Sequence, residues 1–245
     1  MDSIKSNFKN DELLNFCSAK VFNTIKIIKN MKNIAILGTG MVGDSIGTKL
    51  VSLGHKVMMG SRTTNNEKAV AWTLRNGPLA SNGTFADAAA FGEIIFNCTS
   101  GHVSLEALQL AGRENLQGKI LVDVANPLDF SKGMPPSLSV CNTDSLGEVI
   151  QRQFTDVKVV KALNTLNCQL MVNPGLLKDQ GNLFICGNDA AAKAEVESLL
   201  RTFGWEKIID LGDITAARGT EQVLPIWVRL MGKLGTPMFN FSIVS

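Results

Sequence analysis

Short runs of apolar residues recur along the chain from residue 33 onward. Within each run the apolar residues are consecutive rather than alternating with polar ones, which is typical of strands buried on both faces. The runs are Ile34–Leu37, Lys56–Met59, Ile94–Asn97, Ile120–Val124, Val157–Leu163, Leu183–Cys186 and Lys207–Leu211. They predict an α/β protein with a mostly parallel sheet and helices on both of its faces.

Between these runs the spacing of the apolar residues changes to that of a helix. Val42, Ile46, Leu50 and Leu53 share one helical face. Further helices are predicted at Ala69–Leu74, Ala190–Phe203 and about Ala216–Leu234, the last ending at Gly235-Thr236-Pro237.

Residues 1–30 differ in composition from the rest of the chain. They are rich in Lys, Asn and Ile and contain no Gly, Pro or Arg, and their apolar residues have the spacing of an amphipathic helix. Lys and Asn interrupt that apolar pattern, which argues against a signal peptide, and the lack of Arg argues against a transit peptide. We expect either that Met31 is the natural start or that residues 1–30 form a loosely packed extension.

Composition and charge exclude several classes of function. The net charge of +2 belongs to residues 1–30, and the remainder carries 19 basic and 19 acidic groups, so no basic footprint for nucleic acid is predicted. No apolar run reaches 18 residues, so no membrane span is expected. The five Cys contain no C-x-x-C pair, which favours reduced, buried thiols in a cytoplasmic protein without a metal site. The chain contains no Tyr, which excludes reductases whose proton donor is a Tyr phenol.

The sharpest motif is a glycine-rich turn of the form G-x-G-x-x-G between the first predicted strand and the helix after it. The turn comprises Gly38, Thr39, Gly40, Met41, Val42 and Gly43. The first glycine permits the tight turn, the second lets a pyrophosphate approach the backbone, and the third allows close packing of helix and strand. Residues 31–165 are therefore predicted to be a dinucleotide-binding Rossmann domain.

The end of the second predicted strand indicates which dinucleotide is bound. NAD(H) sites usually place an Asp or Glu there to hold the ribose hydroxyls. This chain has Ser61, Arg62 and Thr63, and the next acid is Glu67, several residues into the loop. A hydroxyl and a guanidinium suit the 2′-phosphate of NADP(H), which a carboxylate would repel.

The ends of the later strands are expected to line the nicotinamide. The candidate residues are Thr99, Ser100, Asn126, Pro127, Asn164 and Thr165, although turn capping would explain the two Asn equally well. His102 is a weak candidate for a proton donor, and a solvent-facing residue at a helix start is the alternative. We interpret Lys161 as structural or as an edge charge, and Trp72, Trp205 and Trp227 as core or interface residues.

The quoted residues resemble a known family. The sequence is similar to the F420-dependent NADP oxidoreductases and more distantly to the ferric-reductase domains of STEAP proteins. The segments that carry the resemblance are ILGTGMVG (36–43), GHKVMMGSR (54–62), VDVANP (122–127), VKALNT (160–165), ICGND (185–189) and RGTEQVLP (218–225). The resemblance implies that Thr39, Gly40, Met41 and Val42 cradle the pyrophosphate and that Ser61 and Arg62 take the 2′-phosphate. It also implies that residues 166–245 form a small, largely helical part that walls the hydride site and joins a homodimer. The chain departs from archaeal members at residues 99–102 and 164–167. The resemblance therefore supports NADP(H) as the cofactor more strongly than it supports F420 as the hydride acceptor.

The function that follows is hydride transfer between NADP(H) and a small-molecule acceptor. The acceptor is expected to be coenzyme F420, a flavin, or another heterocyclic or carbonyl compound. Such transfer depends chiefly on positioning, so the lack of an obvious acid or base does not argue against an enzyme. The alternative is a non-catalytic NADP(H)-binding sensor, since a Rossmann fold does not by itself imply catalysis. The C-terminal segment carries more apolar surface than a short exposed tail should, which favours a homodimer; the alternative is that the segment folds back on its own Rossmann domain. The residues are Trp227, Leu230, Met231 and Leu234 at helical spacing, followed by Met238, Phe239, Phe241, Ile243 and Val244.

Overall fold

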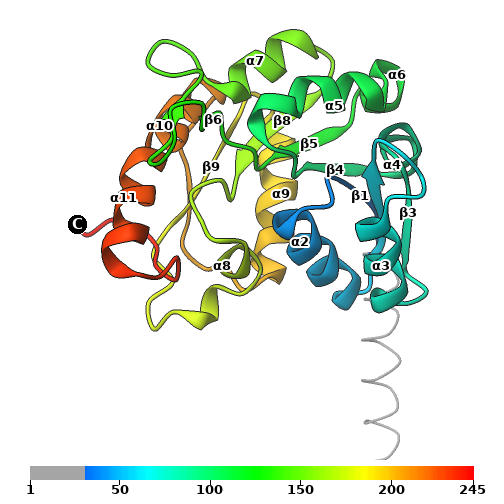
Figure 1. The fold of residues 1–245 in the computed structure, drawn as a ribbon, viewed down its shortest axis with the longest axis horizontal. Helices are drawn as coiled ribbons and strands as arrows, with labels where there is room; N and C mark the ends of the chain where they lie inside the picture. Colours follow the sequence, from blue (N-terminus) through cyan, green and yellow to red (C-terminus); the bar gives the residue numbers. More distant parts are fainter. Residues whose placement is uncertain (1–30) are drawn as a thin grey trace, which may run out of the picture. The chain divides into compact units, whose positions relative to one another are not determined.

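An eight-stranded sheet forms the centre of the described part of the chain, residues 31–245, in this computed structural model (Figure 1). Residues 1–30, which we expect either to precede a natural start at Met31 or to form a loosely packed extension, lie outside the described residues. The strands are β1 (Asn33–Leu37), β2 (Lys56–Ser61), β3 (Ala80–Thr84), β4 (Ile94–Asn97), β5 (Ile120–Asp123), β8 (Lys158–Ala162), β9 (Leu183–Gly187) and β10 (Ile208–Asp210).

The strands lie in the order β10-β9-β8-β5-β4-β1-β2-β3. All neighbouring pairs are parallel except β8 and β9, which are antiparallel. The predicted Rossmann fold with a mostly parallel sheet is thereby confirmed. Because β1 lies between β2 and β4, the strand order reverses at β1, and ligands bind such sheets beyond the carboxyl ends of the strands at this reversal.

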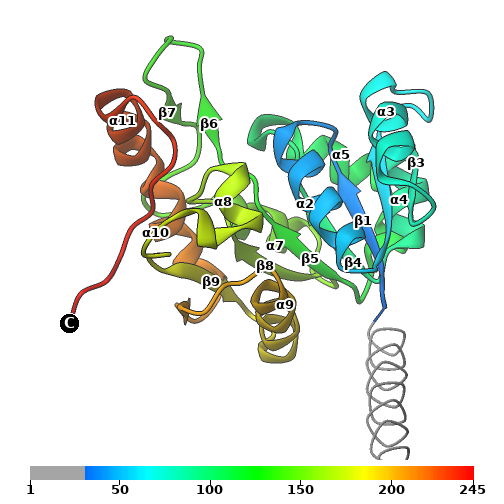
Figure 2. The same cartoon turned by 90° about the horizontal axis from the view of Figure 1, so that it is seen from below.

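Helices cover both faces of the sheet and enclose a separate core on each (Figure 2). One core contains residues of α2 (Met41–Ser52), α3 (Glu67–Asn76), α8 (Cys168–Val172) and α9 (Ala190–Thr202). The other contains residues of α4 (Phe85–Phe91), α5 (Ser104–Ala111), α6 (Arg113–Leu116), α7 (Leu146–Gln153) and α10 (Ala217–Gln222). The short 3-10 helices are η1 (Gly101–Val103), η2 (Pro174–Leu176) and η3 (Ile214–Ala216).

The two cores explain why the strand runs are continuously apolar. In β1, Ile34 and Ile36 pack into the first core and Leu37 packs into the second, and all three are fully buried. Successive side chains of a strand point to opposite faces, so a strand covered on both sides needs apolar residues at every position.

Two sequence-based assignments in the C-terminal third need correction. The single helix predicted over about Ala216–Leu234 is instead two helices, because α10 ends at Gln222 and α11 (Leu224–Leu234) begins after Val223. Pro225 lies in the first turn of α11, where a missing N–H costs nothing, whereas inside a continuous helix it would remove a hydrogen bond. Lys161 is not an edge charge, because β8 lies between β5 and β9 and the Lys161 side chain is fully buried.

The strand β3 was missed, and the prediction of buried thiols holds only in part. The sequence of β3, ASNGT, has no apolar run, and its strand geometry comes from parallel pairing with β2 at the sheet edge. All four described cysteines are free, but Cys186 alone among them is fully buried, and Cys141 is exposed.

Two features beyond the sheet lie on the side of the molecule where α11 is found (Figure 2). A short antiparallel hairpin is formed by β6 (Leu128–Asp129) and β7 (Ser137–Leu138). The segment after α11 folds back along the chain: Asn182 N donates to Phe241 O at 2.8 Å, and Ile243 N donates to Asn182 Oδ1 at 2.6 Å. Within residues 31–245, no helix combines the length and the apolar character needed to cross a bilayer.

Candidate NADP(H) and acceptor site

The glycine turn between β1 and α2 leaves open space where a phosphate would approach. Gly40 is the N-cap of α2, and no side chain caps that helix. A Cβ built on Gly40 meets no atom within 4 Å. The first bond of the helix runs from Asp44 N to Gly40 O at 2.9 Å, so the preceding N–H groups point out of the helix end. Free amides beside open space fit a pyrophosphate.

The other two glycines of the motif are required by the backbone itself. Gly38 has a φ of +117°, and a Cβ there would lie 2.8 Å from Cys98 O. A Cβ on Gly43 would lie 2.2 Å from Gly38 O. Both positions exclude a side chain in the protein as it stands, whereas the structure leaves room for one at Gly40.

The end of β2 presents a basic group without a nearby acid on its own loop. Ser61 is buried, and its hydroxyl donates to Thr63 O at 2.5 Å. The Arg62 side chain is 65% exposed, and its Nε lies 3.9 Å from Glu106 Oε1 on α5. Such a long, exposed ion pair is weak, so Arg62 is available for a stronger bidentate partner such as a phosphate.

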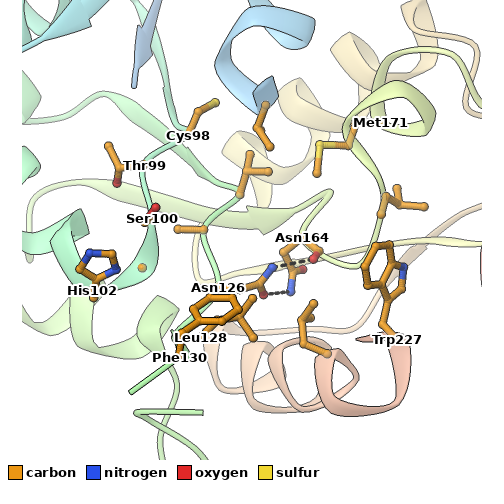
Figure 3. A pocket seen from close by; sticks show the side chains of 16 residues that line it. Cys98, Thr99, Ser100, His102, Asn126, Leu128, Phe130, Asn164, Met171 and Trp227 are labelled. Carbon is orange, nitrogen blue, oxygen red and sulfur yellow. Dashed lines mark hydrogen bonds between the residues drawn. The ribbon is translucent and has the colours of Figure 1, made fainter. Parts of the chain in front are cut away.

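A cavity of about 240 Å³ lies at the carboxyl ends of β4, β5 and β8 (Figure 3). It is lined by Val42, Cys98, Thr99, Ser100, Gly101, His102, Val124, Ala125, Asn126, Leu128, Phe130, Asn164, Leu166, Met171, Leu224 and Trp227. In Figure 3 the turn that carries Thr99, Ser100 and His102 lies on one side, and Met171 and Trp227 lie on the other. The cavity is therefore walled on one side by the loop after β4 and on the other by residues from beyond position 165.

Some of the predicted site residues line this cavity and others do not. Thr99, Ser100, His102, Asn126 and Asn164 line it, as does Val42 from the glycine turn. Pro127 and Thr165 are buried and do not line it.

Asn126 and Asn164, both predicted to line the nicotinamide, form hydrogen bonds with each other. Asn126 Nδ2 donates to Asn164 O at 2.7 Å, and Asn164 Nδ2 donates to Asn126 Oδ1 at 2.9 Å and to Thr220 O at 3.1 Å (Figure 3). Most of the hydrogen bonds that these two side chains form thus connect the loop after β5 with the loop after β8 and with α10. Their first role is to hold these loops together, and any contact with a ligand is added to it.

Two titratable side chains line the cavity, Cys98 and His102. Cys98 is only partly buried as a residue, but the desolvation of its thiol, with a smaller contribution from the charge of Asp123, raises the pKa of that thiol far above its ordinary value. The thiol therefore stays protonated. His102 is exposed, lies in η1, and is free of the core. Among the described residues, the lining of the cavity contains no Asp, Glu, Lys or Arg side chain.

A buried ionic cluster lies behind the cavity. Lys161 Nζ is 2.7 Å from Asp123 Oδ2 and 2.7 Å from Glu221 Oε1, and all three side chains are buried. Burial by itself would lower the pKa of Lys161, but the two carboxylates outweigh it and hold the pKa above its ordinary value. Lys161 is thus a charged ammonium.

Sequence reasoning missed much of the cavity wall. Leu128, Phe130, Leu166, Met171 and Leu224 were not singled out, and Trp227 was assigned to the core or an interface. No local pattern separates such residues from ordinary core residues. Gly101 lies four residues after the end of β4, and a Cβ there would lie 2.1 Å from Asn126 O, so the packing of two loops and not a local motif requires this glycine. In residues 31–245 no group of three His, Cys, Asp or Glu side chains is placed to hold a metal ion.

Comparison with known proteins agrees with this geometry. A family profile described as NADP oxidoreductase coenzyme F420-dependent matches residues 33–127. The crystal structure of a candidate F420-dependent NADP reductase from Arthrobacter sp. FB24 is 52% identical, covers 87% of this chain and 100% of its own, and has a TM-score of 0.85.

Two curated proteins are more distant relatives. The F420-dependent NADP reductase of Methanocaldococcus jannaschii is 28% identical over 212 residues, which are 80% of this chain and 91% of that protein. Rat metalloreductase STEAP3 is 30% identical over 207 residues, which are 82% of this chain. The chain spans only 39% of the length of STEAP3.

Proposed function

Since this chain belongs to the family of F420-dependent NADP oxidoreductases and is an NADP-dependent oxidoreductase, we propose that it transfers hydride between NADP(H) and a heterocyclic acceptor such as the deazaflavin F420 or a flavin. NADPH supplies a hydride from C4 of its nicotinamide, and the acceptor gains that hydride and a proton. The amides that open α2 hold the pyrophosphate, and Ser61 and Arg62 hold the 2′-phosphate.

The observation that carries the proposal is the cavity at the strand ends. Its lining includes Val42 of the glycine turn together with the apolar side chains of Phe130 and Trp227. A charged acceptor ring would lose its hydration there without gaining a partner, whereas a neutral ring gains apolar contact. His102 lines this cavity and is also exposed to solvent, so its imidazole is placed to contact an acceptor bound there.

The test is a turnover assay with the full chain, NADPH and a panel of F420, FMN, FAD and a soluble quinone. We expect NADPH oxidation with at least one ring acceptor, and direct transfer of deuterium from C4-deuterated NADPH to a deazaflavin. Tight NADPH binding without turnover of any acceptor would overturn the proposal and favour a non-catalytic NADP(H) sensor.

A further inference from the structure

Lys161 stands at the junction of three segments of the chain. Its ammonium contacts Asp123 at the end of β5, Glu221 on α10, and the carbonyl of Ala125 at 2.6 Å. An ammonium has three protons, and all three are used. No position remains for a ligand, so Lys161 itself does not touch substrate.

Each carboxylate of the cluster extends the connection to a different wall of the cavity. Asp123 Oδ1 accepts from Asn97 Nδ2 at 2.8 Å, and Asn97 Oδ1 in turn accepts from the Thr99 hydroxyl at 2.7 Å. This branch ends at Thr99, one of the residues that the sequence predicts to line the nicotinamide. We call the wall that carries Thr99 and Asn126 the nicotinamide wall, and the wall that carries Leu224 and Trp227 the acceptor wall. The Ala125 carbonyl directly precedes Asn126 of the same wall.

The Glu221 branch leads to the opposite wall. Its two oxygens accept from Leu146 N at 2.8 Å and Gly147 N at 3.1 Å, which fixes α10 against the first turn of α7. Glu221 is three residues before Leu224 and six before Trp227, both of which line the cavity. The position of Glu221 therefore sets the position of the wall that α11 presents.

A buried cluster of this kind is a poor way to gain stability. Desolvating three charges is costly, and apolar residues of similar volume often stabilise a fold as well or better. What the cluster does supply is geometry, since its short, directional bonds fix atoms on two walls relative to each other.

From this placement we propose that Lys161, with Asp123 and Glu221, is a positioning residue that sets the separation between the nicotinamide wall and the acceptor wall of the cavity. The inference rests on the proposed hydride transfer and adds the residues that control its geometry. Hydride transfer demands close contact of two carbon atoms, and misplacement by about 1 Å from a distant change costs up to about a hundredfold in rate.

The chain offers a matched pair of variants, Glu221→Gln and Glu148→Gln. Both remove one buried carboxylate charge from the contact between α7 and α10. Glu148 on α7 pairs with Arg218 on α10 through two contacts and accepts from Ser145 Oγ at 2.8 Å, but it does not touch Lys161 and does not line the cavity. A merely structural role predicts the same result for both variants.

We expect Glu221→Gln to lower kcat for NADPH oxidation with F420 or FMN by about tenfold or more, with little change in the affinity for 2′,5′-ADP, which lacks the nicotinamide. Glu148→Gln should lower the thermal midpoint to a similar extent and leave kcat near wild type. Glu221→Asp keeps the charge but shortens the side chain, so it should also lower kcat. Equal kcat values for folded Glu221→Asp, Glu148→Gln and wild type would overturn the inference, and that comparison stands even if Glu221→Gln does not fold.

A second measurement keeps this inference separate from the proposed function. If the wild type oxidises NADPH with none of the acceptors, the proposed function fails. The positioning role is then judged by binding alone: Glu221→Asp should weaken NADPH by about threefold or more relative to 2′,5′-ADP. An unchanged ratio of the two affinities would refute the positioning role as well.

Discussion

At the residue scale, Arg62 has the environment of a side chain held ready for an anion. It is the charged group at the end of β2, it is mostly exposed, and its ion-pair partner among residues 31–245, Glu106, lies at the long distance of 3.9 Å. The hydroxyl of Ser61 beside it donates to the Thr63 carbonyl and needs only a rotation to turn towards a phosphate.

Replacing Arg62 by Ala should therefore affect one cofactor and not the other. A charge-assisted bond to the 2′-phosphate contributes about 1.5–3 kcal/mol, so Arg62→Ala should weaken NADPH roughly tenfold or more and leave NADH nearly unchanged. Titration of both cofactors by fluorescence or calorimetry measures this. Arg201→Ala is the control, since Arg201 pairs with Glu197 on α9 and should change neither affinity. Equal losses for NADPH and NADH in Arg62→Ala would contradict the assignment.

At the scale of elements, the turn into α2 separates glycines needed by the fold from the glycine needed by the ligand. Gly40 has a φ of −80°, which any residue adopts, and a methyl group there meets no atom within 4 Å. Gly43 is closed to a side chain by the Gly38 carbonyl. The same motif thus contains one position open to substitution in the free protein and one that is not.

Gly40→Ala should leave the fold intact and sharply weaken the cofactor. The thermal midpoint should stay within a degree or two of wild type, because no contact is strained and an added methyl group restricts the unfolded chain slightly. NADPH affinity should fall by about tenfold or more, since the methyl group occupies the approach of the pyrophosphate. Gly232→Ala, at an open position of α11, is the matched control and should bind NADPH normally. A folded Gly40→Ala protein with wild-type affinity would show that the turn has only a structural role.

At the scale of the whole molecule, the apolar C-terminal segment divides into a part that the same chain covers and a part that it does not. Phe239 packs on Trp227 with ring centroids 5.3 Å apart, and Met238 packs against the first core. In contrast, Ile226 and Leu234 on α11 are 54% and 55% exposed. The homodimer predicted from the sequence would use this outer face of α11 rather than the folded-back segment.

Full-length protein at micromolar concentration should then sediment as a dimer of the 26.4 kDa chain. Ile226→Glu combined with Leu234→Glu should shift it towards monomer, because each buried apolar side chain contributes about 1.5–3 kcal/mol to such an interface and a charge there is costly. Leu74→Glu on α3, which is 80% exposed, is the control and should not change the mass. Deleting residues 236–245 is a less specific test, since it would also uncover Trp227. A monomeric, active wild-type protein would rule the dimer out.

The fold could be predicted from the sequence because its signals are local, and the predicted cofactor site also rests on local signals. Continuous apolar runs follow from a sheet covered on both faces, and the glycine turn and the Ser61-Arg62 pair act through consecutive residues. The sequence analysis did not predict β3, because this strand is held by pairing with β2. It also did not predict the break before α11, because that break depends on one proline in an apolar stretch.

The acceptor half depends on contacts between segments far apart in the chain. The cavity joins residues near positions 42, 98–102, 124–130, 164–171 and 224–227, and no pattern within any one segment marks its apolar residues as a wall rather than as core. Lys161 illustrates the reason: a lysine in an apolar strand looks like an edge charge until folding brings Asp123, 38 residues earlier, and Glu221, 60 residues later, within 2.7 Å of its ammonium. Burial makes that cluster costly unless all its bonds form together, so only the assembled tertiary structure decides where the two walls of the cavity lie.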